Sequence, residues 1–175
     1  PLYVIPKKHS ATFAMFGTQY GSIDCKFKTD KDTDYLELPD GVAHFLEHKM
    51  FEDENGVDAF TRYAETGASA NAFTSFDKTC YIFTATAAVE ESLDILLDFV
   101  SHPYFTEKTV AKEQGIIGQE IRMYEDDAEQ KCMYNCLEAM YENHPVRVNI
   151  AGSVEEIMKT TPELLYKCYN TFYHP

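Results

Sequence analysis

The chain has 175 residues, 45% of them hydrophobic, and its 15 Lys and Arg against 29 Asp and Glu give a formal net charge of −14. A chain of this length and apolar content can bury enough surface to fold as one domain. The acidic balance argues against a nucleic-acid partner, because a negative surface repels the phosphate backbone. No apolar run approaches the roughly 18 residues that a membrane span requires, so we expect no membrane span.

Five scattered cysteines, an odd number without dense spacing, are typical of reduced thiols. They predict a cytoplasmic protein. The sequence begins at Pro1 without a Met and ends directly after a helical pattern. We therefore expect a segment cut from a longer protein, from which a leader could also have been removed.

The first third of the chain alternates between strand and helix signals. Residues 2–5, 11–20 and 24–28 carry β-branched and aromatic residues and predict three strands of an antiparallel meander. Residues 29–37 are rich in charge and predict a loop. From Val42 the apolar spacing changes to that of a helix, which we expect to end near Phe51, and a second helix over 57–66 should end at Gly67.

Residues 69–76 and 79–86 then predict two strands joined by a tight turn at 76–78. The remainder reads as helical, with segments at 89–101, 106–124 and 128–142, a short helix after Ser153 and a last helix beginning at Pro162. Strands and helices do not alternate regularly, so the order predicts an α+β domain, in which several helices cover an antiparallel sheet. Gly115 and Gly118, in the middle of a helix, indicate close packing against another backbone.

The first predicted helix carries the segment His44-Phe45-Leu46-Glu47-His48. Residues four apart lie one above the other on a helix, so both imidazoles can reach one metal ion, and Glu47 lies on the adjoining part of that face. Two imidazoles are typical ligands of a hydrolytic zinc site that keeps one position open for water. Glu47 would then take a proton from that water as general base. A coincidental pair of histidines without bound zinc is the alternative.

A third ligand is available on the long helix, where Glu113 and Glu120 are seven residues apart. Two helical turns separate these carboxylates by about 10 Å along the axis, so a compact site uses one of them as ligand. The other would support a ligand or a neighbouring cation. Spacing alone does not choose between them. The donor set favours zinc, with manganese or cobalt as substitutes.

The H-x-x-E-H segment and its surroundings resemble the insulinase/pitrilysin family of zinc metallopeptidases, which includes the mitochondrial processing peptidases. The matching segments occur in that family's order over nearly the whole chain: residues 41–51, residues 67–74, Glu113 to Glu120, and residues 150–152. The likeness is nearest to the bacterial, processing-protease-like branch. It implies an insulinase-like zinc endopeptidase domain that hydrolyses peptides.

The resemblance also implies roles for individual residues. It implies a zinc site of His44, His48 and Glu120, with Glu47 as general base that activates a zinc-bound water and Glu113 as a supporting catalytic residue. It places Asn71, Ala72 and Phe73 on an edge strand to which an extended peptide substrate adds as another strand. An ordinary strand of a hairpin is the alternative for that segment.

Family members build a chamber from two homologous halves of two similar domains each, so residues 1–175 are expected to be one zinc-bearing N-terminal domain of a chain of about four. The resemblance implies a C-terminal homologous half, in the same chain or in a partner subunit. Without it, we expect the isolated domain to be weakly active or inactive, because substrate positioning would be lost. The alternative function is a non-catalytic, metal-binding scaffold or partner-recognition subunit of a processing-peptidase-like complex.

Overall fold

The computed structural model describes residues 1–173, which form the expected mixture of helices and antiparallel strands. Strands β1 (Thr12–Thr18), β5 (Thr79–Ala85) and β4 (Ser69–Thr74) form a three-stranded antiparallel sheet in that spatial order. The short strands β2 (Lys26–Phe27) and β3 (Leu36–Glu37) pair separately. The helices are α1 (Val42–Lys49), α2 (Ala59–Thr66), α3 (Val89–Ser101), α4 (Glu107–Glu125), α5 (Ala128–Met140), the 3-10 turn η1 (Pro145–Arg147), α6 (Val154–Ile157) and α7 (Pro162–Phe172).

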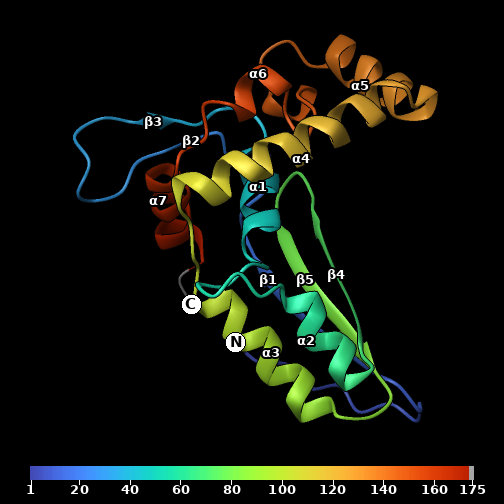
Figure 1. Ribbon diagram of the computed structural model, residues 1–175. Coiled ribbons are helices and arrows are strands. Elements are labelled where there is room, and N and C mark those ends of the chain that lie inside the picture. Colours follow the sequence, from blue (N-terminus) through green and yellow to red (C-terminus); the bar gives the residue numbers. More distant parts are fainter. Residues whose placement is uncertain (174–175) are drawn as a thin grey trace.

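The helices divide into two groups around the sheet (Figure 1). Helices α2 and α3 pack on each other and along the strands, whereas α4 crosses near the other end of the strands together with α5 and α6. Helix α1 lies between these groups and contacts β4, β5, α4 and α7. Residues of α1 therefore face both the sheet and the long helix α4. Side chains from all three can meet at this place.

The core forms where α1 meets the sheet. Tyr20, Phe45, Leu46 and Tyr81 are fully buried there, and Phe99 of α3 packs edge-on against Tyr81 with ring centroids 5.6 Å apart. Burial of large apolar side chains is the main stabilising contribution to a domain of this size. α1 therefore supplies core residues toward the sheet and also contacts α4.

Most of the predicted helix boundaries are confirmed, and the capping residues explain where the helices begin and end. Helix α2 begins later than predicted because the Asp58 side chain accepts a hydrogen bond from the Phe60 N–H and so acts as N-cap. Gly67 ends the same helix in the left-handed conformation, with φ of 73°, as predicted. The hydroxyls of Thr106 and Thr161 cap the starts of α4 and α7.

The predicted meander is wrong. Residues 2–5 form no strand, and Leu2 and Tyr3 are 89% and 80% exposed. β-branched and aromatic residues favour an extended chain, but a strand also needs a partner, and the described residues provide none for this segment. β1 pairs with the distant β5 instead of with β2, and the predicted loop at 29–37 contains the short strand β3.

Two glycines allow the backbone to approach closely at the start of α1. Gly41 has φ of 91°, and a Cβ there would lie 2.3 Å from the Ala151 carbonyl oxygen. Gly152 has φ of 73°, and its Cβ would lie 2.3 Å from the Asp40 carbonyl oxygen. Only glycine combines this backbone conformation with so close a contact at low cost. The close approach of residues 40–41 to residues 151–152 therefore fixes where α1 begins.

The expected close packing at Gly115 and Gly118 is wrong, because a Cβ at either position would meet no atom within 4 Å.

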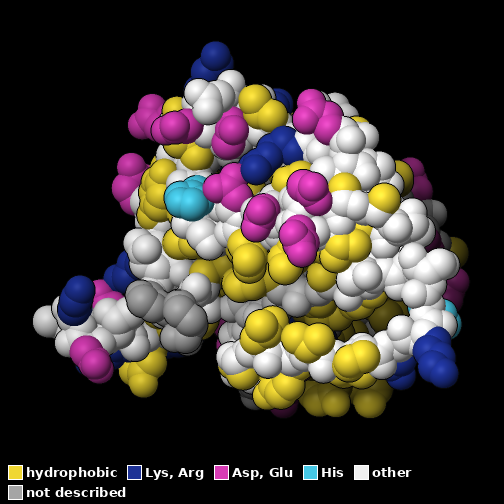
Figure 2. Space-filling model, turned by 90° about the horizontal axis from the view of Figure 1, so that it is seen from below, with side chains coloured by type: hydrophobic (Ala, Val, Ile, Leu, Met, Phe, Trp, Pro, Cys, Tyr) yellow, Lys and Arg dark blue, Asp and Glu magenta, His cyan; other side chains and the backbone are white. Residues whose placement is uncertain are grey.

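The five cysteines are free thiols, as predicted, whereas the cytoplasmic location stays a prediction. Acidic side chains gather on the face shown in Figure 2, which is the end of the molecule formed by α2 and α3. Among residues 1–173, no helix combines the length and the apolar character needed to span a membrane.

Candidate metal centre

The two histidines of α1 lie on the side of the helix that faces α4. His44 and His48 are one turn apart, and their ring centroids are 4.6 Å apart in an edge-to-face arrangement. His44 is 9% exposed, and the His48 side chain is about one quarter exposed. Their Nε2 atoms both point toward Glu120. The helical spacing thus places the two imidazoles as the sequence predicted.

Helix α4 supplies both predicted glutamates, and each reaches a different atom. Glu120 Oε1 lies 3.7 Å from His44 Nε2, and Glu120 Oε2 lies 3.4 Å from His48 Nε2. Glu113 Oε1 lies 3.0 Å from Nδ1 of His48, on the other side of that ring. The geometry therefore distinguishes the two carboxylates. Glu120 faces the Nε2 atoms of both histidines, and Glu113 is hydrogen-bonded to the opposite ring nitrogen of His48.

The donor atoms suit a zinc ion. One ligand atom from each of His44, His48 and Glu120 lies within 4.8 Å of the others. Tetrahedral zinc with bonds of about 2.1 Å separates its ligand atoms by about 3.4 Å, close to the distances between Glu120 and the two imidazoles. Two imidazoles and one carboxylate are also the donor chemistry of hydrolytic zinc sites. That these residues hold zinc stays a prediction.

Burial and the two carboxylates set the charges of the histidines. Burial, with a contribution from His48, lowers the pKa of His44 to about 4, so this imidazole is neutral at pH 7. Burial by itself would lower the pKa of His48, but hydrogen bonds to Glu113 and Glu120 outweigh it and raise that pKa to about 9. The bond from His48 lowers the pKa of Glu120 to about 2. The pair of carboxylates therefore favours a positive charge at His48.

Glu47 lies on the adjoining side of α1 and is 8% exposed. Its Oε2 accepts a hydrogen bond of 2.5 Å from the Thr74 hydroxyl of β4. Burial raises the pKa of Glu47, and the bond from Thr74 opposes part of that rise. A carboxylate with a raised pKa is better matched to proton transfer near neutral pH than an exposed one.

Two contacts of the site were missed from the sequence. Thr74 contacts Glu47 across 27 positions of the sequence. The Tyr124 hydroxyl donates a 2.5 Å hydrogen bond to Glu120 Oε1, and this bond raises the Tyr124 pKa to about 12. The spacing of Tyr124 and Glu120, four apart on one helix, is a signal that could have identified the second contact. The first depends on tertiary structure alone.

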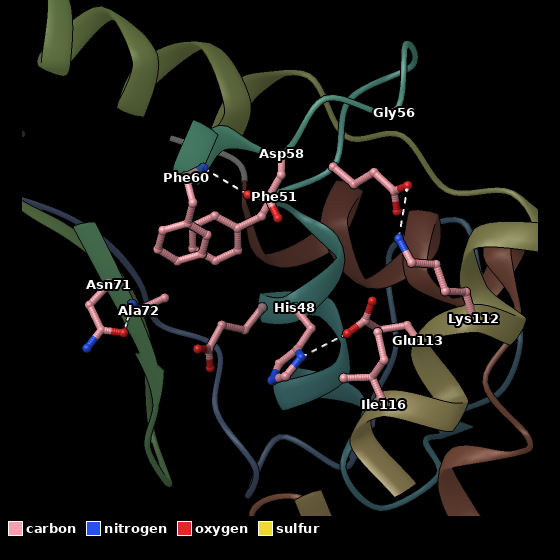
Figure 3. Close-up of a pocket in the computed structure, with 12 residues that line it drawn as sticks. His48, Phe51, Gly56, Asp58, Phe60, Asn71, Ala72, Lys112, Glu113 and Ile116 are labelled. Carbon is pink, nitrogen blue, oxygen red and sulfur yellow. Dashed lines mark hydrogen bonds and ion pairs between the residues drawn. The ribbon is translucent and has the colours of Figure 1, made fainter. Parts of the chain in front are cut away.

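A cleft of about 340 Å³ opens beside the site (Figure 3). His48 and Glu113 form one wall, and Asn71 and Ala72 of β4 form the facing wall. The rings of Phe51 and Phe60 stack at the upper end with centroids 4.5 Å apart. Glu47 also lines this cleft, so a molecule bound there would reach the candidate general base.

β4 is an edge strand of the three-stranded sheet, as predicted. Its side chains alternate between exposed and half-buried, with Asn71 and Phe73 exposed and Ala72 half-buried. The Ala72 N–H is bonded to the side-chain oxygen of Asn71 at 2.9 Å rather than to β5. Phe73 does not line the cleft. The structure thus brings Asn71 and Ala72, but not the Phe73 side chain, to the candidate substrate-binding region.

Comparison with known proteins shows the family of the chain. The model of the family "Insulinase (Peptidase family M16)" matches residues 32–154. A Bacillus subtilis (strain 168) protein named "Uncharacterized zinc protease YmfH" is 54% identical over 175 residues, which are 99% of this chain and 41% of that protein. A second protein of that strain, "Uncharacterized zinc protease YmxG", is 31% identical over 140 residues, which are 77% of this chain and 34% of that protein.

A solved structure shows the same fold. An M16-like peptidase from Alicyclobacillus acidocaldarius has a TM-score of 0.89 and 49% sequence identity, and the match covers 95% of this chain and 38% of that one. The chain thus spans about two fifths of the relatives that it matches over most of its own length. The family match includes α1, β4 and α4, which are the elements that carry the site. The chain therefore belongs to the insulinase family of peptidases, peptidase family M16.

Proposed function

We propose that this chain is the zinc-bearing N-terminal domain of a zinc-dependent endopeptidase that hydrolyses peptides bound as an extended strand. The observation that carries the proposal is the convergence of His44, His48 and Glu120 within 4.8 Å, beside the buried carboxylate of Glu47. The relatives are named zinc proteases, which supports the choice of metal and of reaction.

His44, His48 and Glu120 would hold the ion. When bound, zinc supplies a Lewis acid that lowers the pKa of a water to near neutrality and polarises a peptide carbonyl. Glu113 keeps the Nε2 of His48 directed toward Glu120, because it accepts the hydrogen bond from the opposite nitrogen of the ring. Tyr124 restrains Glu120 by donating a hydrogen bond to its Oε1.

Glu47 performs the proton transfers in this proposal. Its carboxylate takes a proton from the attacking water, so that the water oxygen can bond to the peptide carbonyl carbon. It then gives this proton to the nitrogen of the departing amine as the C–N bond breaks. Burial in the cleft wall raises the pKa of Glu47, which suits a group that must both accept and return a proton.

The edge of β4 would bind the substrate. Ser75 N–H bonds to the Lys78 carbonyl at the turn, and antiparallel alternation then directs the main-chain groups of Ala70, Ala72 and Thr74 away from β5. A peptide can pair with these groups regardless of its side chains. The Asn71 side chain occupies the Ala72 N–H and would move aside when a peptide carbonyl takes its place.

The whole protein would add what this chain lacks. The chain covers 41% and 38% of two relatives, which supports a longer protein with a C-terminal homologous half, either in the same chain or in a partner subunit. That half would enclose and position the peptide. The isolated domain would then be weakly active or inactive, because the geometry of the reacting groups depends on substrate positioning.

The test uses the full-length protein that contains this chain, purified without chelators. We expect one zinc per site and cleavage of members of a diverse peptide library. Glu47→Gln should keep the zinc and lose cleavage, because it removes the proton acceptor and leaves the three ligands. Loss of zinc together with activity would contradict the role of Glu47. A zinc-loaded wild-type protein that cuts no peptide would support the scaffold function instead.

A further inference from the structure

We propose that Thr74 is a positioning residue that links the peptide-binding edge of β4 to the general base. The inference rests on the proposed function, since it assigns Thr74 to the same reaction. Thr74 is the residue at which two features of the site meet. Its side chain bonds to Glu47, and its main chain belongs to the free edge of the sheet.

The contact with Glu47 is specific. Among the described residues, the Thr74 hydroxyl is the side-chain hydrogen-bond partner of the Glu47 carboxylate. Glu47 has three side-chain torsions and is 8% exposed, so burial alone restricts its position without fixing the direction of its oxygen atoms. A hydrogen bond of 2.5 Å to one oxygen fixes that direction and leaves the other oxygen for a water proton.

The Thr74 hydroxyl has a second polar neighbour, and its bond to Glu47 does not depend on it. Thr79 lies directly across the ladder from Thr74, and their hydroxyl oxygens are 3.3 Å apart. The Thr79 hydroxyl donates to the Tyr20 carbonyl at 2.9 Å, which uses its proton. Thr79 could therefore only accept the Thr74 proton, but Thr74 donates to the nearer and negatively charged Glu47 oxygen, at 2.5 Å against 3.3 Å. The β-branched Thr74 side chain also has few alternative rotamers.

The main-chain N–H and C=O groups of Thr74 point away from β5, toward the open edge of the sheet. Along β4, residues 69, 71 and 73 direct their N–H and C=O groups toward β5, whereas 70, 72 and 74 direct theirs to the open edge. The Ala72 N–H confirms this alternation, because it bonds to the Asn71 side chain rather than to the ladder. A peptide that pairs with this edge lies against the backbone of the residue whose hydroxyl holds Glu47. The positions of peptide and base are therefore coupled through Thr74.

The experiment compares Thr74→Val and Thr74→Ser in the full-length, zinc-loaded protein, with a peptide that the wild type cleaves. Valine has the shape of threonine without the hydroxyl, and it leaves the main-chain edge in place. We expect Thr74→Val to lower kcat by about 10- to 100-fold, because a misplaced base loses part of its catalytic contribution. KM and zinc content should stay close to wild type. Thr74→Ser, which restores the hydroxyl, should recover most of the lost kcat.

Thr79→Val is the matched control. It removes a hydroxyl from the facing residue of the same ladder, where the lost partner is the Tyr20 carbonyl rather than Glu47. We expect a lower melting temperature with kcat retained. If Thr74→Val does not fold, Thr74→Ala replaces it with the same expectation.

Two results with the Thr74 variants themselves would overturn the coupling: wild-type kcat in the valine variant, or a loss of kcat that serine does not restore. An equal loss of kcat in Thr79→Val would overturn it as well, because both losses would then reflect general damage to the hairpin. The proposed function fails separately, if the zinc-loaded wild type cleaves no peptide or if Glu47→Gln still cleaves.

Discussion

In the proposed zinc site, removing the charge that Glu113 places beside His48 should weaken zinc binding. Glu113→Gln keeps the size of the side chain and an oxygen that can accept the Nδ1–H, but it removes the negative charge 3.0 Å from the ring. Glu113 is 9% exposed, so water replaces little of the lost interaction. Loss of such a supporting contact weakens metal binding by about 10- to 100-fold. This corresponds to about 1.4–2.7 kcal/mol of binding free energy.

The size of this effect should depend on pH. Glu113 also stabilises the proton on His48, whose pKa is raised to about 9, and a metal ion must displace that proton. Glu113→Gln lowers the His48 pKa, so the proton competes less in the variant than in the wild type. The full loss of zinc affinity is therefore expected near pH 9, where the proton competes least. The loss should shrink as the pH falls toward about 6.5.

The assay is competition with a chromophoric zinc chelator, carried out on the full-length protein at several pH values between these limits. Glu107→Gln is the control, because Glu107 is an exposed residue in the first turn of the same helix. It should leave the zinc affinity unchanged. Equal affinities of Glu113→Gln and wild type at the alkaline limit would refute the supporting role. A loss that grows as the pH falls would refute the argument from proton competition.

Two further predictions concern the ligand on α4 and the start of α1. Glu120→Gln should weaken zinc binding more than Glu113→Gln in the same assay, because it changes the group that faces both imidazoles; unchanged zinc content would require another third ligand. Gly41→Ala should lower the free energy of unfolding by at least about 1–3 kcal/mol in denaturant titrations, because φ is 91° and the new Cβ would lie 2.3 Å from the Ala151 oxygen. Gly115→Ala, where a Cβ meets no atom within 4 Å, should stabilise by up to about 1 kcal/mol, and equal stability of the two variants would contradict this reasoning.

Features that depend on neighbours in the sequence were determined by the sequence alone. The four-residue spacing of His44 and His48 places both imidazoles on one side of any helix that contains them, whatever packs around it. The hairpin of β4 and β5 and the glycine that ends α2 follow from local backbone preferences in the same way. The apolar segment at residues 2–5 shows the limit of such reasoning, because an extended chain becomes a strand only beside a partner.

Tertiary structure decided how the side chains are used. Seven-residue spacing places Glu113 and Glu120 on one side of α4 but does not say which one meets the histidine Nε2 atoms. The crossing of α1 and α4 decides this, because it brings Glu120 to the donor atoms and Glu113 to the back of His48. The bond between Thr74 and Glu47 likewise joins a strand to a helix across 27 positions. Periodicity cannot predict such a contact, because it depends on how two elements pack and not on the pattern within either.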